Sequence, residues 1–311
     1  MNHFRTHSSK IRGPLVPILS AFKADGSLDI DSTCRWIEWL LDQGMKLFWT
    51  THGTSHYMTL TDQELIDLNK ALASVIAGRG FFIASTPIDW STNQCQIFTE
   101  QAAGWGVDAV KLQLDWRWEP SDALLLSHYQ TVAASSPLPL LAYTFGKPGI
   151  SPDLLRRIIE IPQFIGLKND TDDYYGHELY LRTVRTHSDP DEFVVMTGGG
   201  LSSVFFGYEF GVKAYGDGIA WFAPRRSLEF YHYMEAGQRD KALHFIKKFE
   251  EPTRLQWSAL GIGQQWSWGH TVLELVGFFE SRNMRFPLQA LSNEQAAAAR
   301  AFLEKWELLP G

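Results

Sequence analysis

Eight short apolar runs recur along the chain, each bordered by turn-forming or polar residues. Runs of four to eight apolar residues with such borders are typical of strands buried on both faces. The predicted strands cover residues 15–19, 47–50, 80–84, 109–112, 138–143, 164–167, 193–197 and 214–219.

Amphipathic stretches lie between these runs, with apolar residues at three- and four-residue spacing, which predicts helices. Examples are residues 31–43, 61–76, 92–104, 121–133 and 152–160. Three of them carry start signals. Asp31 precedes Ser32, Thr61 is followed by Glu64 in the spacing of a capping box, and Ser151 precedes a proline at the first helical position.

Strands that alternate with helices at this spacing are parallel and joined by crossover helices. Eight such units predict an α/β fold, a (β/α)8 TIM barrel over residues 1–223, with residues 224–311 as a C-terminal helical extension packed on it. An open, doubly wound sheet is the alternative. It is disfavoured because no G-x-G-x-x-G turn follows the first strand, where Gly13-Pro14 instead precedes it.

Composition agrees with one large globular unit. The 311 residues are 45% hydrophobic and 20% charged, and no Pro/Gly/Ser-rich linker divides them. The net charge of −7 argues against a nucleic-acid partner, because no basic stripe is available to neutralise phosphates. Cys34 and Cys95 match no metal or redox spacing, and we find neither a signal peptide nor a membrane-spanning stretch, so we expect a cytoplasmic protein.

Lys168 ends the apolar run 164–167, and the polar residues 169–173 that follow are predicted to be a loop. An amine at the mouth of a low-dielectric interior has a lowered pKa, because desolvation disfavours the ammonium form, and the free lone pair can attack a ketone. The alternative is an ordinary surface lysine that pairs with Asp170 or Asp172.

Other candidate groups also follow predicted strands, and in a barrel the chemistry sits at the carboxyl ends of the strands. They are Gly53-Thr54-Ser55, the segment Asp115-Trp116-Arg117-Trp118, Tyr143, Gly198-Gly199-Gly200 and Asp217. A lysine nucleophile, a tyrosine as proton carrier and a Gly-Thr-Ser turn that offers donors to a carboxylate are what attack on a 2-oxo acid requires. Taken alone, Tyr143 could equally be an interior tyrosine and the turn an ordinary one.

Several of these segments together resemble one family, the dihydrodipicolinate synthase and N-acetylneuraminate lyase superfamily of class I, lysine-dependent pyruvate aldolases. The similarity covers nearly the whole chain. It rests on the following segments: the opening strand from Gly13 to Phe22 with Asp25-Gly26, Gly53-Thr54-Ser55, Leu60-Thr61-Asp62-Gln63-Glu64, Leu138 to Tyr143, Ile165-Gly166-Leu167-Lys168 and Phe286-Pro287-Leu288.

The resemblance implies roles for the catalytic residues. Lys168 forms an imine with a pyruvate-like acid, Tyr143 relays protons, and Thr54 and Ser55 hold the carboxylate and complete the relay. Gly53, His56, Trp116, Arg117, Gly198 and Asp217 are expected to contact the substrate. The resemblance also implies a homo-oligomer, a dimer or tetramer, with a small 2-oxo acid as its partner and no cofactor.

Departures from the family pattern argue against dihydrodipicolinate synthesis itself. His56-Tyr57 stands where the synthases carry Gly-Glu, and Asp115-Trp116-Arg117 stands where they carry Pro-Tyr-Tyr. Pro148, with Lys147 beside it, aligns with the arginine that grips their second substrate. We therefore expect a different substrate, with Arg117 pairing with a distal carboxylate and the tryptophans covering a ring or an apolar tail. The alternative is a surface loop in a subunit contact.

Two further interpretations concern anions and metals. Gly198-Gly199-Gly200 before a helix start at Leu201 could cradle a phosphate or simply line the substrate cavity. His52 and His56 flank the Gly-Thr-Ser turn, but no third ligand has suitable spacing, so we predict no metal. The sequence thus predicts a lyase, an aldolase or hydro-lyase that uses a lysine Schiff base. The alternative is a barrel that has lost turnover and binds a small acid as a sensor or partner protein.

Overall fold

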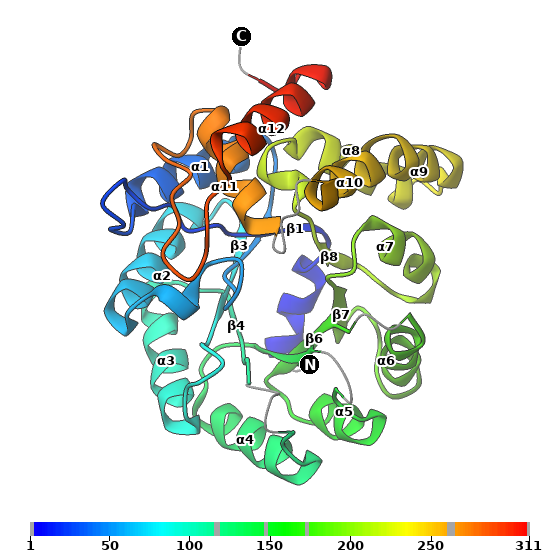
Figure 1. Ribbon diagram of the computed structural model, residues 1–311. Coiled ribbons are helices and arrows are strands. Elements are labelled where there is room, and N and C mark those ends of the chain that lie inside the picture. The colour runs from blue at the N-terminus through cyan, green and yellow to red at the C-terminus, as the bar shows by residue number, and fades with distance from the viewer. Residues whose placement is uncertain (1–2, 115–118, 146–148, 172–173, 260–264, 310–311) are drawn as a thin grey trace.

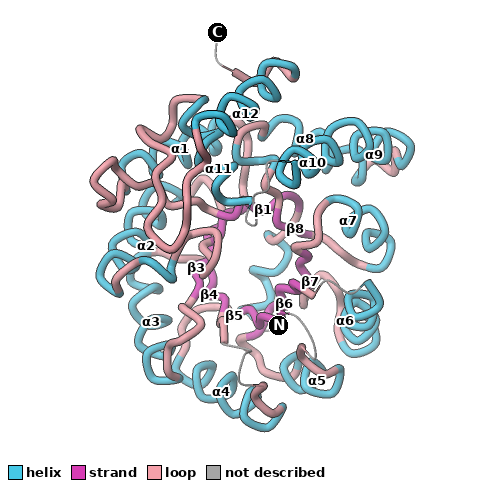
Figure 2. Tube along the Cα trace, viewed as in Figure 1, coloured by secondary structure: helices cyan, strands magenta, loops and turns pink. Residues whose placement is uncertain are grey.

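The computed structural model describes residues 3–114, 119–145, 149–171, 174–259 and 265–309, and its eight parallel strands form a closed barrel in chain order. Figure 2 shows the strands as an inner ring with helices outside. The strands are β1 (Gly13–Pro17), β2 (Leu47–Trp49), β3 (Phe81–Ser85), β4 (Ala109–Lys111), β5 (Leu140–Phe145), β6 (Phe164–Asp170), β7 (Val194–Thr197) and β8 (Ala214–Gly216). All eight predicted strands are present, so the (β/α)8 barrel is confirmed.

One irregularity in the barrel decides which residues of β6 face inward. Leu140 of β5 lies opposite Phe164, but the next residue, Leu141, lies opposite Gly166, so the register slips by one residue. A slip of one residue exchanges the two faces of a strand. Because of it, Lys168 rather than Leu167 lies opposite Tyr143.

Strand β6 is also longer than expected. Residues 169 and 170 were predicted to lie in a loop, and this is wrong, because Asn169 pairs with Thr144 of β5 and Thr197 of β7. Their polar side chains are satisfied inside the structure. The Asn169 amide nitrogen lies 2.7 Å from His177 Nδ1, and Asp170 pairs with Lys168. Polar residues can thus extend a buried strand when each finds a partner.

Helices cover the outside of the barrel (Figure 1). They are α1 (Ile30–Asp42), α2 (Asp62–Ile76), α3 (Thr92–Trp105), α4 (Asp122–Ser135), α5 (Pro152–Ile159), α6 (Tyr174–His187), α7 (Leu201–Gly207) and α8 (Pro224–Glu235). The capping box of Thr61 and Glu64 and the Ser151 cap are confirmed. The first helix starts earlier than predicted, since Asp29 and not Asp31 caps it by accepting a hydrogen bond from the Ser32 amide at 3.0 Å.

The additional C-terminal helices are confirmed as well. They are α9 (Arg239–Phe245), a π-helical turn (Ile246–Glu250), α10 (Glu251–Ala259), α11 (Gln265–Leu275) and α12 (Asn293–Lys305). Helix α11 approaches the segments that follow β1 and β8, because a β-carbon on Gly269 would lie 2.8 Å from both Leu19 and Trp221. The division into units at residue 223 stays a prediction. In the part of the chain that the structure describes, no helix is long and apolar enough to cross a membrane.

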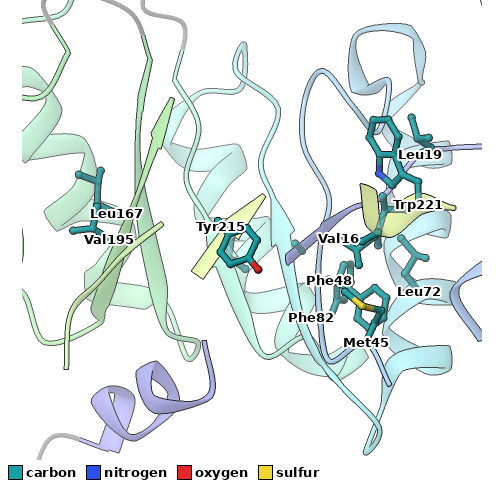
Figure 3. Packing of buried hydrophobic residues seen from close by; sticks show 14 of the residues in the cluster. Val16, Leu19, Met45, Phe48, Leu72, Phe82, Leu167, Val195, Tyr215 and Trp221 are labelled. Carbon is teal, nitrogen blue, oxygen red and sulfur yellow. The ribbon is translucent and has the colours of Figure 1, made fainter. Parts of the chain in front are cut away.

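The core consists of two apolar layers, because successive residues of each strand face opposite sides. Leu15 and Leu47 belong to the layer inside the barrel, whereas their neighbours Val16 and Phe48 pack outward against the helices. Figure 3 shows part of the outer layer, including Val16, Phe48, Phe82 and Trp221.

A short 3-10 helix, His3–Lys10, covers the amino-terminal end of the barrel. Phe4 packs against the inner layer, and the Ser8 hydroxyl donates to the Asp191 carbonyl. The opposite end, where the strands have their carboxyl termini, carries the cavity described next.

Candidate active site

A cavity of about 1110 Å³ opens at the carboxyl ends of the strands. Its wall includes residues two positions after members of the inner apolar layer, which therefore face the same way. Trp49 follows Leu47 in this manner, and Tyr143 follows Leu141. The C-terminal helices complete the wall with Arg254 and Trp257 of α10 and Trp266 of α11.

Lys168 lies on this wall with only 1% of its surface exposed. Its Nζ donates a hydrogen bond to the Asp170 carboxylate and lies 4.9 Å from the centre of the Trp49 ring. Burial lowers the pKa of Lys168, while the charge of Asp170 acts in the opposite direction. The surface-lysine alternative is thus wrong about exposure, although it names the correct partner.

Tyr143 lies beside Lys168 on the neighbouring strand and is partly buried. Burial raises the pKa of Tyr143, and the charge and hydrogen bonding of Asp170 raise it further. The phenol therefore keeps its proton at neutral pH and acts as a hydrogen-bond donor. Asp170 is the residue that links the tyrosine and the lysine.

Gly198 makes room for this arrangement. A β-carbon at this position would lie 2.5 Å from Lys168 Nζ and would overlap with the Asp170 carboxylate. Any side chain here would displace the ion pair. Gly198 also lines the cavity, as predicted for a substrate-contacting residue.

The rest of the triple-glycine loop does not resemble a vacant phosphate cradle. Gly200 has φ +82°, a conformation that favours glycine, and it leads into α7. The Leu201 amide at the start of that helix donates to the buried Glu250 carboxylate at 3.0 Å. A protein carboxylate thus takes the place that the phosphate interpretation reserved for a ligand, and the cavity-lining interpretation describes the loop better.

The Gly-Thr-Ser turn is held rigidly at the end of β2. Gly53 and Thr54 line the cavity, and a β-carbon on Gly53 would lie 2.5 Å from the Trp266 ring. The Ser55 hydroxyl, by contrast, donates to the Ile18 carbonyl at 2.7 Å and accepts from the Thr51 amide at 3.0 Å. Ser55 is fully buried and ties the turn to β1, so the geometry supports Thr54 but not Ser55 as a direct carboxylate ligand.

His56 lies behind the cavity wall. Its backbone is left-handed, with φ 57°, and its ring packs against Phe22 and Trp266. His56 Nε2 lies 2.7 Å from His270 Nε2, so one ring donates to the other. Burial and the neighbouring histidine lower the pKa of His56. The predicted substrate contact of His56 therefore lacks support in this geometry.

Asp217 lines the cavity, but both of its carboxylate oxygens have protein partners. One accepts from the Ile219 amide at 2.8 Å and the other from the Ser227 hydroxyl of α8 at 2.6 Å. Burial raises the pKa of Asp217 to about 6. Its main effect is to join the end of β8 to α8.

The remaining site predictions concern Trp116 and Arg117, which lie outside the described residues. Among the residues that are described, no group of three or more His, Cys, Asp or Glu side chains could hold a metal ion.

The sequence interpretation missed several buried residues of the wall, and Lys111 is the lysine among them. It is 1% exposed, and its Nζ lies 4.3 Å from the centre of the Trp49 ring and 5.3 Å from that of Tyr143. A signal for it was present, because Lys111 lies within the predicted buried strand 109–112, where a charged side chain is unusual. In the structure, alternation places Lys111 on the same interior face as Ala109. Nothing comparable points to Arg254, Trp257 or Trp266, which reach the cavity from helices distant in sequence.

Comparison with known proteins agrees with this architecture. The family model described as "Dihydrodipicolinate synthetase family" matches residues 10–306. The chain is 28% identical over 251 residues to a probable 5-dehydro-4-deoxyglucarate dehydratase 2 of Streptomyces avermitilis, which covers 80% of this chain and 73% of that protein. It is 30% identical over 166 residues to the 4-hydroxy-tetrahydrodipicolinate synthase of Saccharophagus degradans, covering 52% and 57% of the two chains.

Among solved structures, the dihydrodipicolinate synthase of Oceanobacillus iheyensis superposes with a TM-score of 0.87 over 98% of this chain and 99% of its own. The identity of 17% makes this a likeness of fold alone. The family model, by contrast, spans all eight strands and both the lysine and the tyrosine of the cavity. The chain belongs to the dihydrodipicolinate synthetase family.

Proposed function

We propose that this protein is a lyase, an aldolase or hydro-lyase, that acts on a pyruvate-related 2-oxo acid through a Schiff base on Lys168. The observation that carries the proposal is the buried Lys168 amine on the wall of a large cavity, beside a protonated tyrosine. Burial favours the neutral amine, which is the nucleophilic form.

The reaction begins when the neutral amine attacks the ketone carbon and the C=O electron pair moves to oxygen. The resulting carbinolamine loses its hydroxyl as water, for which Tyr143 supplies a hydrogen-bond donor. The imine then withdraws electrons from the neighbouring carbons. Loss of a C3 proton gives an enamine, which can expel the C4 hydroxyl as water when that hydroxyl is protonated. In aldol cleavage, the alternative from the same imine, the C4 hydroxyl gives its proton to a base and C4 becomes a carbonyl carbon. The C3–C4 electron pair then forms the C2=C3 bond of the enamine, and the C=N pair moves to nitrogen.

The Gly53-Thr54 turn is the proposed site for the substrate carboxylate, because it lines the cavity close to the strand ends. Ser55 contributes by holding the turn against β1. Gly198 contributes by leaving space for the Lys168–Asp170 pair.

The substrate is proposed to differ from that of dihydrodipicolinate synthesis. The sequence departs from the synthases at His56-Tyr57, and the Streptomyces avermitilis relative is named a dehydratase. Dehydration and aldol cleavage start from the same imine, so the proposal includes both.

Borohydride trapping tests the proposal. Pyruvate is added to the protein, the mixture is reduced, and the protein mass and the modified peptide are determined. We expect one reduced adduct on Lys168 and none in Lys168→Ala. Wild-type protein that forms no adduct, or an adduct mapped to Lys111, contradicts the proposal. An adduct without turnover of any 2-oxo acid favours the sensor alternative instead.

The predicted homo-oligomer and cytoplasmic location form part of this proposal. Light scattering on the purified protein distinguishes a dimer or tetramer from a monomer, and a mass of 35.3 kDa in solution would contradict the oligomer.

A further inference from the structure

Two lysines, not one, are buried in the cavity wall. Lys111 on β4 and Lys168 on β6 both line the cavity, and both have their Nζ atoms within 5 Å of the centre of the same Trp49 ring, at 4.3 and 4.9 Å. Asp170 supplies a carboxylate beside them, which accepts a hydrogen bond from the Lys168 Nζ. The two amines therefore share an environment in which a second positive charge is costly.

This cost makes Lys111 easy to deprotonate. Burial and the charge of Lys168 lower the pKa of Lys111 to about 7, although Asp170 acts in the opposite direction. At neutral pH such an amine exists in both forms and can accept or return a proton, which is the property of an efficient general base.

A purely structural role explains Lys111 poorly. The position follows Ala109 in the apolar interior of the barrel, and a methionine there would fill a similar volume without desolvating an amine. The neighbouring groups are less suited to this chemistry. Tyr143 keeps its proton, and Asp170 is engaged with Lys168.

We propose that Lys111 is a second catalytic amine, which takes the C3 proton of the substrate once that substrate is bound as an imine to Lys168. This inference rests on the proposed function. In the step, the C3–H electron pair becomes the C2=C3 bond, the C2=N pair moves to the imine nitrogen, and Lys111 becomes an ammonium ion. The ammonium then returns the proton to C3 or donates it to a hydroxyl that leaves C4 as water.

Exchange of the pyruvate methyl protons in D2O measures this step directly, because exchange requires the enamine but no second substrate. We would follow it by proton NMR for wild type and Lys111→Met, and measure borohydride trapping on the same samples. We expect Lys111→Met to form the Lys168 adduct at close to the wild-type level while its exchange rate falls by about 10²–10⁴-fold. Retained trapping also shows that the variant is folded.

The dependence on pH gives a second readout that a packing role would not produce. The wild-type exchange rate should rise with pH through about 7, as Lys111 loses its proton, and this rise should be missing in Lys111→Met. Lys70→Met is the matched control, because Lys70 lies 5.5 Å from the Trp105 ring on the exposed surface of α2. It should leave trapping and exchange unchanged.

The outcomes separate this inference from the function on which it rests. Wild-type protein that neither traps nor exchanges contradicts the Schiff-base proposal itself. Trapping in the wild type with exchange in Lys111→Met within about threefold of it overturns only the role of Lys111. Equal loss of trapping and exchange in Lys111→Met also overturns that role, because Lys111 would then support imine formation or the fold.

Discussion

Asp170 lies two residues after Lys168 on the same strand, and its carboxylate accepts a hydrogen bond from the lysine Nζ. Both side chains therefore point into the barrel. The pair stabilises the ammonium form of Lys168, whereas burial stabilises the amine. Burial and the Asp170 charge thus shift the pKa of Lys168 in opposite directions. Removing either one should change the fraction of neutral amine, and with it the rate of attack, in a defined direction.

Replacing Asp170 by asparagine should lower the pKa of Lys168 further, because the negative charge that favours the ammonium is removed. The rate of imine formation with pyruvate should then reach its plateau at a lower pH than in wild type. Borohydride quenching over a pH series measures this. Asp67→Asn is the control, because Asp67 is an exposed carboxylate on α2. A plateau that moves to higher pH in Asp170→Asn would refute the electrostatic account.

Replacing Gly198 by alanine should displace the Lys168–Asp170 pair, because the new methyl group would occupy the space of both side chains. Displacement of a catalytic group by about 1 Å can cost about 10²-fold in rate, and we expect a loss of that order in adduct formation. Gly104→Ala on α3 is the matched control. It has open space around it and should stabilise the protein by about 0.4–1 kcal/mol without affecting the adduct.

Tyr143→Phe should slow imine formation by about 10²–10⁴-fold, because the hydroxyl that assists the loss of water is removed. This corresponds to about 3–5 kcal/mol in the barrier. Rapid-quench trapping measures the rate. A loss smaller than about tenfold would assign the proton transfer to another group. Lys111 would then be the first residue to test, because its Nζ lies 5.3 Å from the centre of the Tyr143 ring. His56 is less suitable, because it lies behind the cavity wall and pairs with His270.

Glu64→Gln should weaken the contact between α2 and the segment after α11. Arg285 donates to both carboxylate oxygens of Glu64, at 2.8 and 2.6 Å, and lowers the pKa of Glu64 from 4.5 to about 2. Because the folded pKa is depressed, this stabilisation is complete above about pH 4.5 and is lost as the pH falls toward 2.

We therefore expect Glu64→Gln to lower the Tm by about 1–3 °C at pH 7, with a smaller difference at pH 3. Thermal unfolding at both pH values measures it. Glu100→Gln, an exposed change on α3, should have no effect at either pH. An equal difference at pH 7 and pH 3 would mean that Glu64 acts through packing rather than charge.

The sequence was sufficient for features that depend on local pattern. Alternating apolar runs and amphipathic stretches located all eight strands, and the position of Lys168 at the end of one of them identified a candidate nucleophile. It was insufficient where tertiary contacts decide. The register slip opposite Leu141 and the strand character of Asp170 depend on neighbouring strands, and neither has a local signature.

Proximity in sequence was also misleading at the Gly-Thr-Ser turn. His56 directly follows the turn, yet its left-handed backbone turns the ring away from the cavity toward His270. Conversely, Trp266 is more than two hundred residues away and packs directly on Gly53. Helices after the barrel thus supply part of the wall, and strand-end reasoning cannot find them.

The 3-10 helix at the amino-terminal end has a consequence for turnover. Since this helix and the inner apolar layer fill that end of the barrel, the cavity exchanges molecules only through the side where the strands end, as far as the described residues show. Substrate and product must then pass through the same opening of the cavity. Product that remains in the cavity should accordingly compete with substrate, and the rate at which product leaves would limit how often a new cycle can begin.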